Sequence, residues 1–161
     1  MTKPGPAISM LLAALDEAFD RPAWHGTNLR GSLRGLSPKC AAWRPEPGRH
    51  NIWEIAVHAA YWKYAVRRAL TGAPRGSFAH RGSNWFPRET PGAALWRRDL
   101  ELLGDEHRLL RAAVAGLPVA RLNQLSAKKS YTMGALVRGA AAHDVYHAGQ
   151  IQLLKRLCGA T

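Results

Sequence analysis

The stretch from residue 136 to residue 156 repeats apolar side chains with the period of an α-helix. One face of this helix carries His143 and His147 together with the apolar residues Leu136, Ala140, Ile151 and Leu154. Residues four apart on a helix have Cβ atoms about 5–6 Å apart, so the two imidazoles can converge on one ion. Polar groups on a buried face need partners. Two interpretations stay open here: a shared metal, or two core histidines that bond separately to carbonyl or hydroxyl groups.

Three other segments predict long helices, because their apolar residues also recur every three or four positions. They cover residues 7–20, 52–70 and 90–115. Shorter helical turns are expected in residues 29–36 and near residues 39–43. No segment alternates apolar and polar residues with the period of a strand. The sequence therefore predicts an all-α protein, a four-helix bundle whose long connecting loops permit a non-sequential order of helices.

Capping residues mark the starts of the predicted helices. Asn51 followed three residues later by Glu54 has the spacing of a capping box. Thr90, which precedes a proline, and Thr132 are expected to cap the helices that follow them. These signals place the helix boundaries independently of the apolar period.

The length of 161 residues predicts one domain, residues 1–161, with a substantial core. Hydrophobic residues make up 47% of the chain and charged residues 21%, as in an ordinary globular protein. No apolar run approaches the ~20 residues of a membrane span, and no signal peptide is expected. A long loop at residues 75–88 contains Trp85 and Phe86, and loops of this length are often functional.

Cys40 and Cys158 are the two cysteines of the chain, and they lack CxxC spacing. This usage favours a reducing, cytoplasmic setting. It also argues against a metal site built from thiolates.

The net charge is +12, from 23 Lys and Arg against 11 Asp and Glu. Such an excess raises the expectation of acidic partners, nucleic acid among them. The basic residues are scattered along the chain, with no run of five. A solvated surface is therefore favoured over a nucleic-acid-binding footprint.

A third histidine, His58, lies on the inward face of the predicted helix at residues 52–70, together with Ile55 and Trp62. Three neutral imidazoles hold a divalent ion from one side and leave a coordination position for water or substrate. Imidazole suits several divalent ions, so the ligand type does not select one. His58, His143 and His147 are the predicted ligands, with Zn favoured and Ni, Fe or Mn as alternatives.

Two stretches, Asn51–His58 and Ala141–Ile151, resemble the signature motifs of the DinB-like metalloprotein superfamily, and residues 23–26 resemble one branch of it. The resemblance implies a four-helix bundle that holds a divalent metal on the three histidines named above, and frequent homodimers. It also implies a relationship to thiol-dependent S-transferases and isomerases that use low-molecular-weight thiols. Many members have no assigned reaction, and the family name refers to DNA-damage induction.

Four residues are candidates for a substrate pocket: Trp24, His25, Trp62 and Gln150. His25 follows a helix break, where it can line a pocket mouth or simply cap or pack. Trp62 has the helical spacing of a core residue as well as that of a substrate platform. Gln150 lies three residues after His147, so its amide can reach bound water or a substrate.

Other polar residues near the motifs have less specific roles. Glu54 and Asp144 are candidates to orient the ligands, although a surface role is favoured for Asp144. His50 is expected to bond locally, and His80 and His107 to lie in a loop and on the surface.

Two classes of function follow. In the first, the protein is a metal-dependent enzyme acting on a small thiol or electrophile, because the predicted site lacks a fourth protein ligand. In the second, it is a non-catalytic stress-response module with a structural metal and a basic surface. The net charge and the lack of an acid/base carboxylate on the ligand face favour this alternative. The enzyme is favoured, with the catalytic residues unassigned.

Overall fold

The computed structural model describes residues 4–126 and 130–159, and the bundle predicted from the sequence is present within them. Its four long helices are α1 (Pro6–Phe19), α4 (Ile52–Thr71), α5 (Ala93–Ala115) and α6 (Met133–Leu157). Its short elements are α2 (Leu29–Ser32), α3 (Pro38–Ala42) and the 3-10 turn η1 (Val119–Arg121). The described part of the chain contains no strand. None of its helices is long and apolar enough to cross a membrane.

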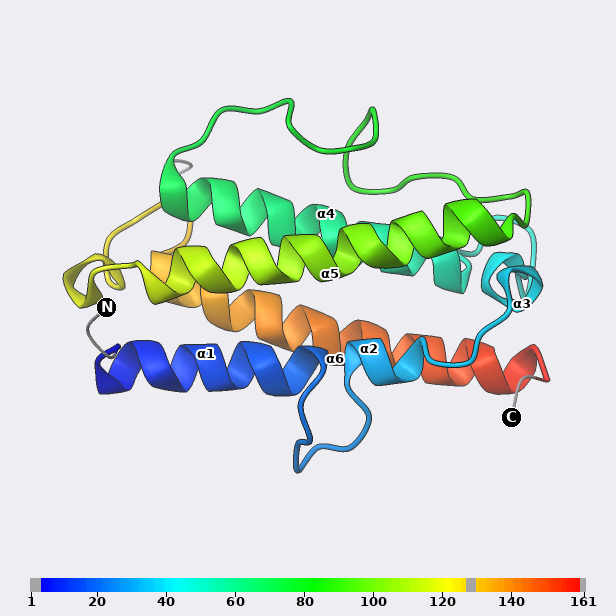
Figure 1. The fold of residues 1–161 in the computed structure, drawn as a ribbon, viewed down its shortest axis with the longest axis horizontal. Coiled ribbons are helices and arrows are strands. Elements are labelled where there is room, and N and C mark those ends of the chain that lie inside the picture. The colour runs from blue at the N-terminus through cyan, green and yellow to red at the C-terminus, as the bar shows by residue number, and fades with distance from the viewer. Residues whose placement is uncertain (1–3, 127–129, 160–161) are drawn as a thin grey trace.

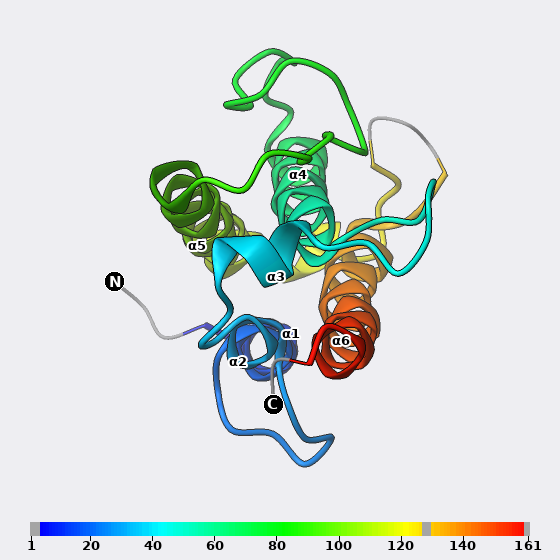
Figure 2. The same ribbon diagram turned by 90° about the vertical axis from the view of Figure 1, so that its right-hand side faces the viewer.

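The order of the helices around the bundle is not sequential. α1 and α4 lie diagonally opposite each other, and both pack against α5 and α6 (Figure 2). The neighbours α4 and α5 run in the same direction, so no short turn can join them (Figure 1). Residues 72–92 instead return along the length of the bundle, over α4. This parallel pair is the reason for the long loop, and it brings loop residues onto α4.

Two of the three predicted caps are confirmed. Asn51 Oδ1 accepts a hydrogen bond from Glu54 N at 2.8 Å, and Thr132 Oγ1 accepts one from Ala135 N at 3.2 Å. The prediction that Thr90 caps α5 is wrong. The helix begins at Ala93 after Gly92, which makes no side-chain cap. Glycine resists helical conformation because it loses the most backbone freedom, so the chain stays extended through it.

A layer of polar side chains divides the core into two apolar clusters. One cluster contains Trp53, and the other contains Leu110. Between them lie Lys63 of α4, His107 of α5 and Asp144 of α6, which are 1%, 6% and 1% exposed. The prediction that His107 and Asp144 lie on the surface is therefore wrong.

Both residues are buried because Lys63 gives each of them a partner. Its ammonium group forms an ion pair with Asp144 Oδ2 and lies 3.5 Å from His107 Nδ1. The His107 ring also stacks on Phe19, with ring centroids 3.8 Å apart. A charged side chain is tolerated inside a protein when such a partner is present.

Cys40 of α3 and Cys158, at the end of α6, are joined by a disulfide bond, with Cα atoms 6.1 Å apart. The pairing corrects the expectation drawn from cysteine usage, because disulfides persist in oxidising compartments. The two cysteines therefore no longer support a cytoplasmic location. Neither sulfur is a free thiol.

Candidate metal centre

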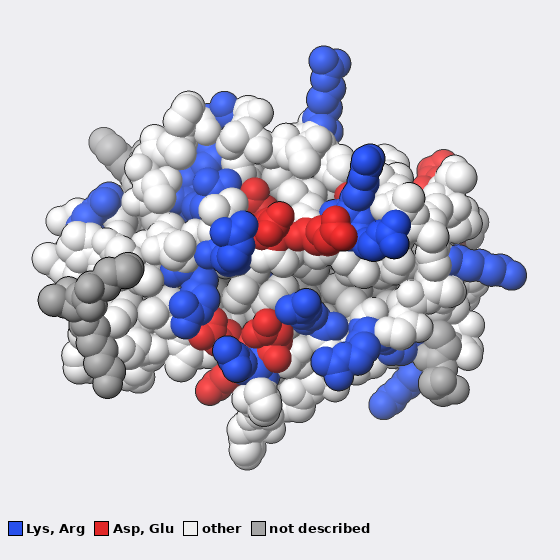
Figure 3. All heavy atoms as spheres, viewed as in Figure 1, with Lys and Arg blue, Asp and Glu red and all other residues white. Residues whose placement is uncertain are grey.

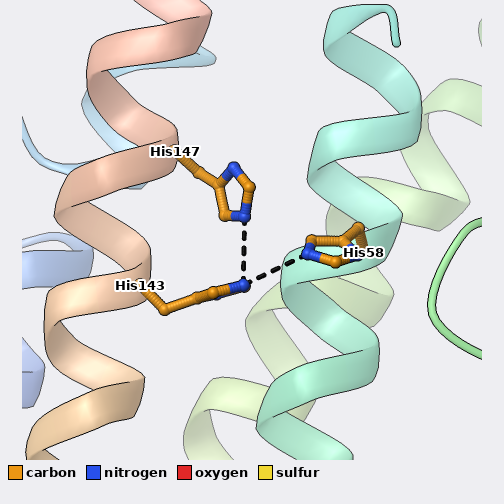
Figure 4. Close-up of side chains that lie close together, drawn as sticks. All are labelled: His58, His143 and His147. Carbon is orange, nitrogen blue, oxygen red and sulfur yellow. Dashed lines mark hydrogen bonds between the residues drawn. The ribbon is translucent and has the colours of Figure 1, made fainter.

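His58 from α4 and His143 and His147 from α6 direct their imidazoles toward one another between the two helices (Figure 4). The Nε2 atom of His143 lies 3.1 Å from that of His58 and 3.0 Å from that of His147. Two Zn–N bonds of about 2.0–2.1 Å at a tetrahedral angle separate their nitrogens by about 3.3 Å. The three nitrogens are thus spaced so that they could share one ion, and the ligand atoms of the three histidines all lie within 4.8 Å of one another.

Hydrogen bonds on the far side of two rings set which nitrogen faces the centre. His58 Nδ1 lies 2.8 Å from the carbonyl oxygen of Asn84, and His147 Nδ1 lies 2.6 Å from Gln150 Oε1. Both oxygens are acceptors, so each keeps a proton on Nδ1 and leaves a lone pair on Nε2. His143 Nε2 has at most one proton and cannot donate to both neighbours. A cation among the three nitrogens satisfies all of them.

Burial keeps the three imidazoles neutral. Desolvation lowers the pKa of His58 to about 4 and that of His143 to about 3, and repulsion from neighbouring histidines adds to both shifts. Desolvation also lowers the pKa of His147. Neutral imidazole is the form that binds metal ions, so the ligands are ready for an ion at neutral pH.

The loop between α4 and α5 contributes two residues that were not predicted. Asn84 accepts the His58 bond through its carbonyl, and its Oδ1 accepts one from Trp62 Nε1 at 3.0 Å. Its φ is +66°, in the left-handed region that asparagine tolerates better than most residues. Trp85 stacks on His58 at 3.8 Å between ring centroids, with 10° between the ring planes. An asparagine followed by tryptophan in a long loop is the only sequence signal for this contact.

Glu54 supports this arrangement indirectly. Its buried carboxylate accepts bonds from the Arg44 guanidinium, from His50 Nδ1 at 3.1 Å and from Arg88 N at 3.1 Å. Burial alone would raise the pKa of Glu54, but the bonds from Arg44 and His50 lower it. His50, which bonds locally as expected, stacks on Trp85 with ring centroids 3.5 Å apart. Glu54 therefore orients the ring behind Trp85 and does not complete a capping box or contact the three histidines.

The structure brings two of the four pocket candidates to the centre. Trp62, 40% exposed, makes an edge contact with His58, with ring centroids 6.3 Å apart and 69° between the ring planes. Gln150 Oε1 lies 2.6 Å from His147 Nδ1, on the side of the ring away from the cluster, so it orients the His147 imidazole. Trp24 and His25 are exposed in the loop between α1 and α2. This loop lies on the side of the bundle away from residues 72–92 (Figure 1). Their role in a pocket stays a prediction.

A family model described as the DinB superfamily matches residues 22–151. The chain belongs to the DinB superfamily. The matched region includes the three histidines and both loop residues that contact His58, so the resemblance in the two motifs is confirmed for most of the chain. No curated protein and no solved structure matches this DinB protein.

Proposed function

We propose that this DinB protein is a metal-dependent enzyme that uses a low-molecular-weight thiol. Its ligands are His58, His143 and His147, with Zn as the favoured ion and Ni, Fe or Mn as alternatives. The observation that carries the proposal is the pair of Nδ1 hydrogen bonds, which leaves two lone pairs directed at His143 Nε2. Hydrogen bonds of this kind orient histidine ligands in metal sites.

A bound divalent ion with three protein ligands lowers the pKa of a thiol or water molecule at its remaining position. The protein holds the ligands neutral by burial and fixes two of the rings through Asn84 and Gln150. Trp62 and Tyr146, 40% and 63% exposed, lie next to the ligands and offer aromatic surface to a substrate.

The reaction class is S-transfer, in which a thiol adds to an electrophilic carbon. A carbon–sulfur bond forms while the S–H bond and one bond of the electrophilic carbon, either a π bond or a bond to a leaving group, break. The thiol proton ends on the atom that receives the electron pair of that broken bond. No carboxylate among the described residues is available at the ligand face for acid/base work, since Glu54 is held by Arg44 and His50 and Asp144 by Lys63. We therefore expect the reactivity to come from the metal ion and the thiol.

The alternative is a non-catalytic stress-response module whose metal ties α4 to α6 and whose basic surface binds nucleic acid. The net charge of +12 favours it. On the face of the bundle formed by α5, α1 and α2, however, basic and acidic side chains are interspersed (Figure 3). Such a mixture does not form the continuous basic stripe of a nucleic-acid-binding surface.

We further propose that the protein is a homodimer. Near its C-terminal end, the outer side of α6 exposes two large apolar side chains that are four residues apart, Leu153 and Leu157. A second copy of the chain is the partner that the family resemblance implies for such a surface. Sedimentation or light scattering at micromolar concentration measures this directly, and a monomeric mass contradicts it.

The metal is tested first. Purified protein refolded with Zn²⁺ is expected to hold about one ion per chain, because the cluster has one set of three imidazoles. His58→Ala or His147→Ala should remove most of the ion, whereas the control variant His25→Ala, at an exposed histidine, should retain it. Absence of metal from the wild type refutes the proposal.

The thiol is tested in the Co²⁺-substituted protein. Bacillithiol, mycothiol or glutathione should change the visible spectrum of the wild type, and His143→Ala should lose the response. DNA binding is measured in parallel as a function of salt, because phosphate contacts give a steep salt dependence. Tight DNA binding at physiological salt without any response to thiols favours the binding module.

A further inference from the structure

The ion pair between Lys63 and Asp144 lies in the polar layer of the core, beside the three histidines. Both side chains are almost fully buried, at 2% and 1% exposure. Lys63 is five residues after His58 on α4, and Asp144 directly follows His143 on α6. The pair therefore joins the two helices that carry the predicted metal ligands, close to those ligands.

Stability alone does not account for a pair in this position. Removing two charges from water costs several kcal/mol per ion, and well-packed apolar residues often replace a buried pair without loss. Here the hydrogen bonds lost to water are not all replaced, because Asp144 Oδ1 is buried and has no hydrogen-bond partner among the described residues. A buried oxygen without a hydrogen bond costs free energy, so the ion pair stabilises the fold less than an apolar contact of the same size would.

The side chains of α4 and α6 indicate why an ion pair between these helices is useful for their alignment. The buried residues of the two helices include six alanines beside larger side chains such as Ile55 and Ile151; the alanines are Ala56, Ala59, Ala60, Ala140, Ala141 and Ala148. Alanines interlock less than large side chains, so they specify weakly how far one helix slides along the other. One helical turn is about 5.4 Å, whereas a metal site needs its ligands placed to about 0.5 Å.

We propose that Lys63 and Asp144 are positioning residues that fix the axial register of α6 against α4, and thereby hold His143 and His147 against His58. This inference rests on the metal-binding role proposed above. Buried polar pairs are known to set helix register in coiled coils at a cost in stability. In this bundle, the pair fixes the register before an ion binds, and the ion then binds to ligands that are already in place.

The test replaces the pair by apolar residues, in the double variant Lys63→Met/Asp144→Leu. It should fold with a Tm, measured without metal, close to that of the wild type, because loss of the Lys63 contact with His107 offsets the gain from removing the buried charges. Its affinity for Zn²⁺, measured by competition with a chelator, should fall about 10- to 100-fold, as for other losses of ligand support. The visible spectrum of its Co²⁺ form should also broaden or shift.

The matched control is the double variant Arg67→Met/Glu106→Leu. It removes an ion pair of 3.1 Å from the next turn of α4, but that pair joins α4 to α5 and not to α6. Its Zn²⁺ affinity should stay within about threefold of that of the wild type, since this pair does not connect α4 to α6, the helix that carries His143 and His147.

The outcomes separate this inference from the proposed function. Absence of Zn²⁺ binding by the wild type refutes the proposed function. Equal Zn²⁺ affinity in the wild type and the Lys63→Met/Asp144→Leu variant refutes the positioning role alone, and so does an equal loss in the control. If the double variant does not fold, Asp144→Asn replaces it, because this change keeps the volume and removes one charge. A loss of at least threefold is then expected, and unchanged affinity overturns the inference.

Discussion

The buried histidine of α5 should make the stability of the bundle sensitive to mild acid. His107 is 6% exposed, and its Nδ1 lies 3.5 Å from the Lys63 ammonium. Desolvation and the positive charges of Lys63 and Arg111 lower its pKa to about 3, against an opposing effect from Asp16. The folded protein therefore keeps this imidazole neutral over a range in which the unfolded chain protonates it.

The size of the effect follows from the two pKa values. His107 takes up its proton near pH 6.5 in the unfolded chain and near pH 3 in the folded chain. The stability that the neutral imidazole contributes is therefore fully present above pH 6.5 and is lost as the pH falls toward 3. Between pH 7 and pH 5 the shift corresponds to a loss of about 2 kcal/mol in the free energy of unfolding. His107→Gln removes the titrating group and should remove this part of the loss.

Urea unfolding at pH 7 and pH 5, with a chelator present to exclude metal effects, measures the difference. The three histidines of the metal centre contribute to the pH dependence of both proteins, so the comparison isolates His107. His25→Gln, at an exposed histidine, serves as the matched control and should keep the wild-type dependence. An equal change in unfolding free energy for wild type and His107→Gln would refute the reasoning.

Two further predictions concern single contacts. Gln150→Leu removes the acceptor that lies 2.6 Å from His147 Nδ1. The affinity for Zn²⁺, measured by competition with a chelator, should then be about 10-fold weaker. Gln152→Leu, two positions along the helix, is the control. Cys40→Ser opens the disulfide across 118 residues, and the chain-entropy model gives a loss of up to about 5 kcal/mol in the unfolding free energy. Urea unfolding with and without a reductant checks this, because reduced wild type and Cys40→Ser should then agree.

The features predicted from the sequence are those that local spacing determines. The apolar period gave the four long helices, and Asn51 and Thr132 gave two of their starts. The spacing of His143 and His147 placed two ligands on one helical face, because a helix fixes the relation between residues four apart. The third ligand, His58, was found from its own helical face and the resemblance.

The features that escaped prediction depend on contacts between distant segments. Asp144 has the local surroundings of a surface residue, and only packing against Lys63, 81 residues away, makes it part of the core. The cysteines are 118 residues apart, and their spacing carries no information about pairing. Asn84 reaches His58 because α4 and α5 run parallel, a relation that no local pattern encodes.

At the candidate metal centre, the helices and the loop at residues 72–92 contribute different groups. The three histidines lie on helices, whereas the Asn84 carbonyl oxygen that binds His58 and the Trp85 ring that stacks on it belong to a loop outside the bundle. Loops accept insertions and exchanges more readily than helices do. The surroundings of the three imidazoles can therefore diverge through this one connection while the helices that carry them stay as they are. A different loop grafted between Thr71 and Ala93 would therefore change the contacts around His58 without altering the helices that carry the three histidines.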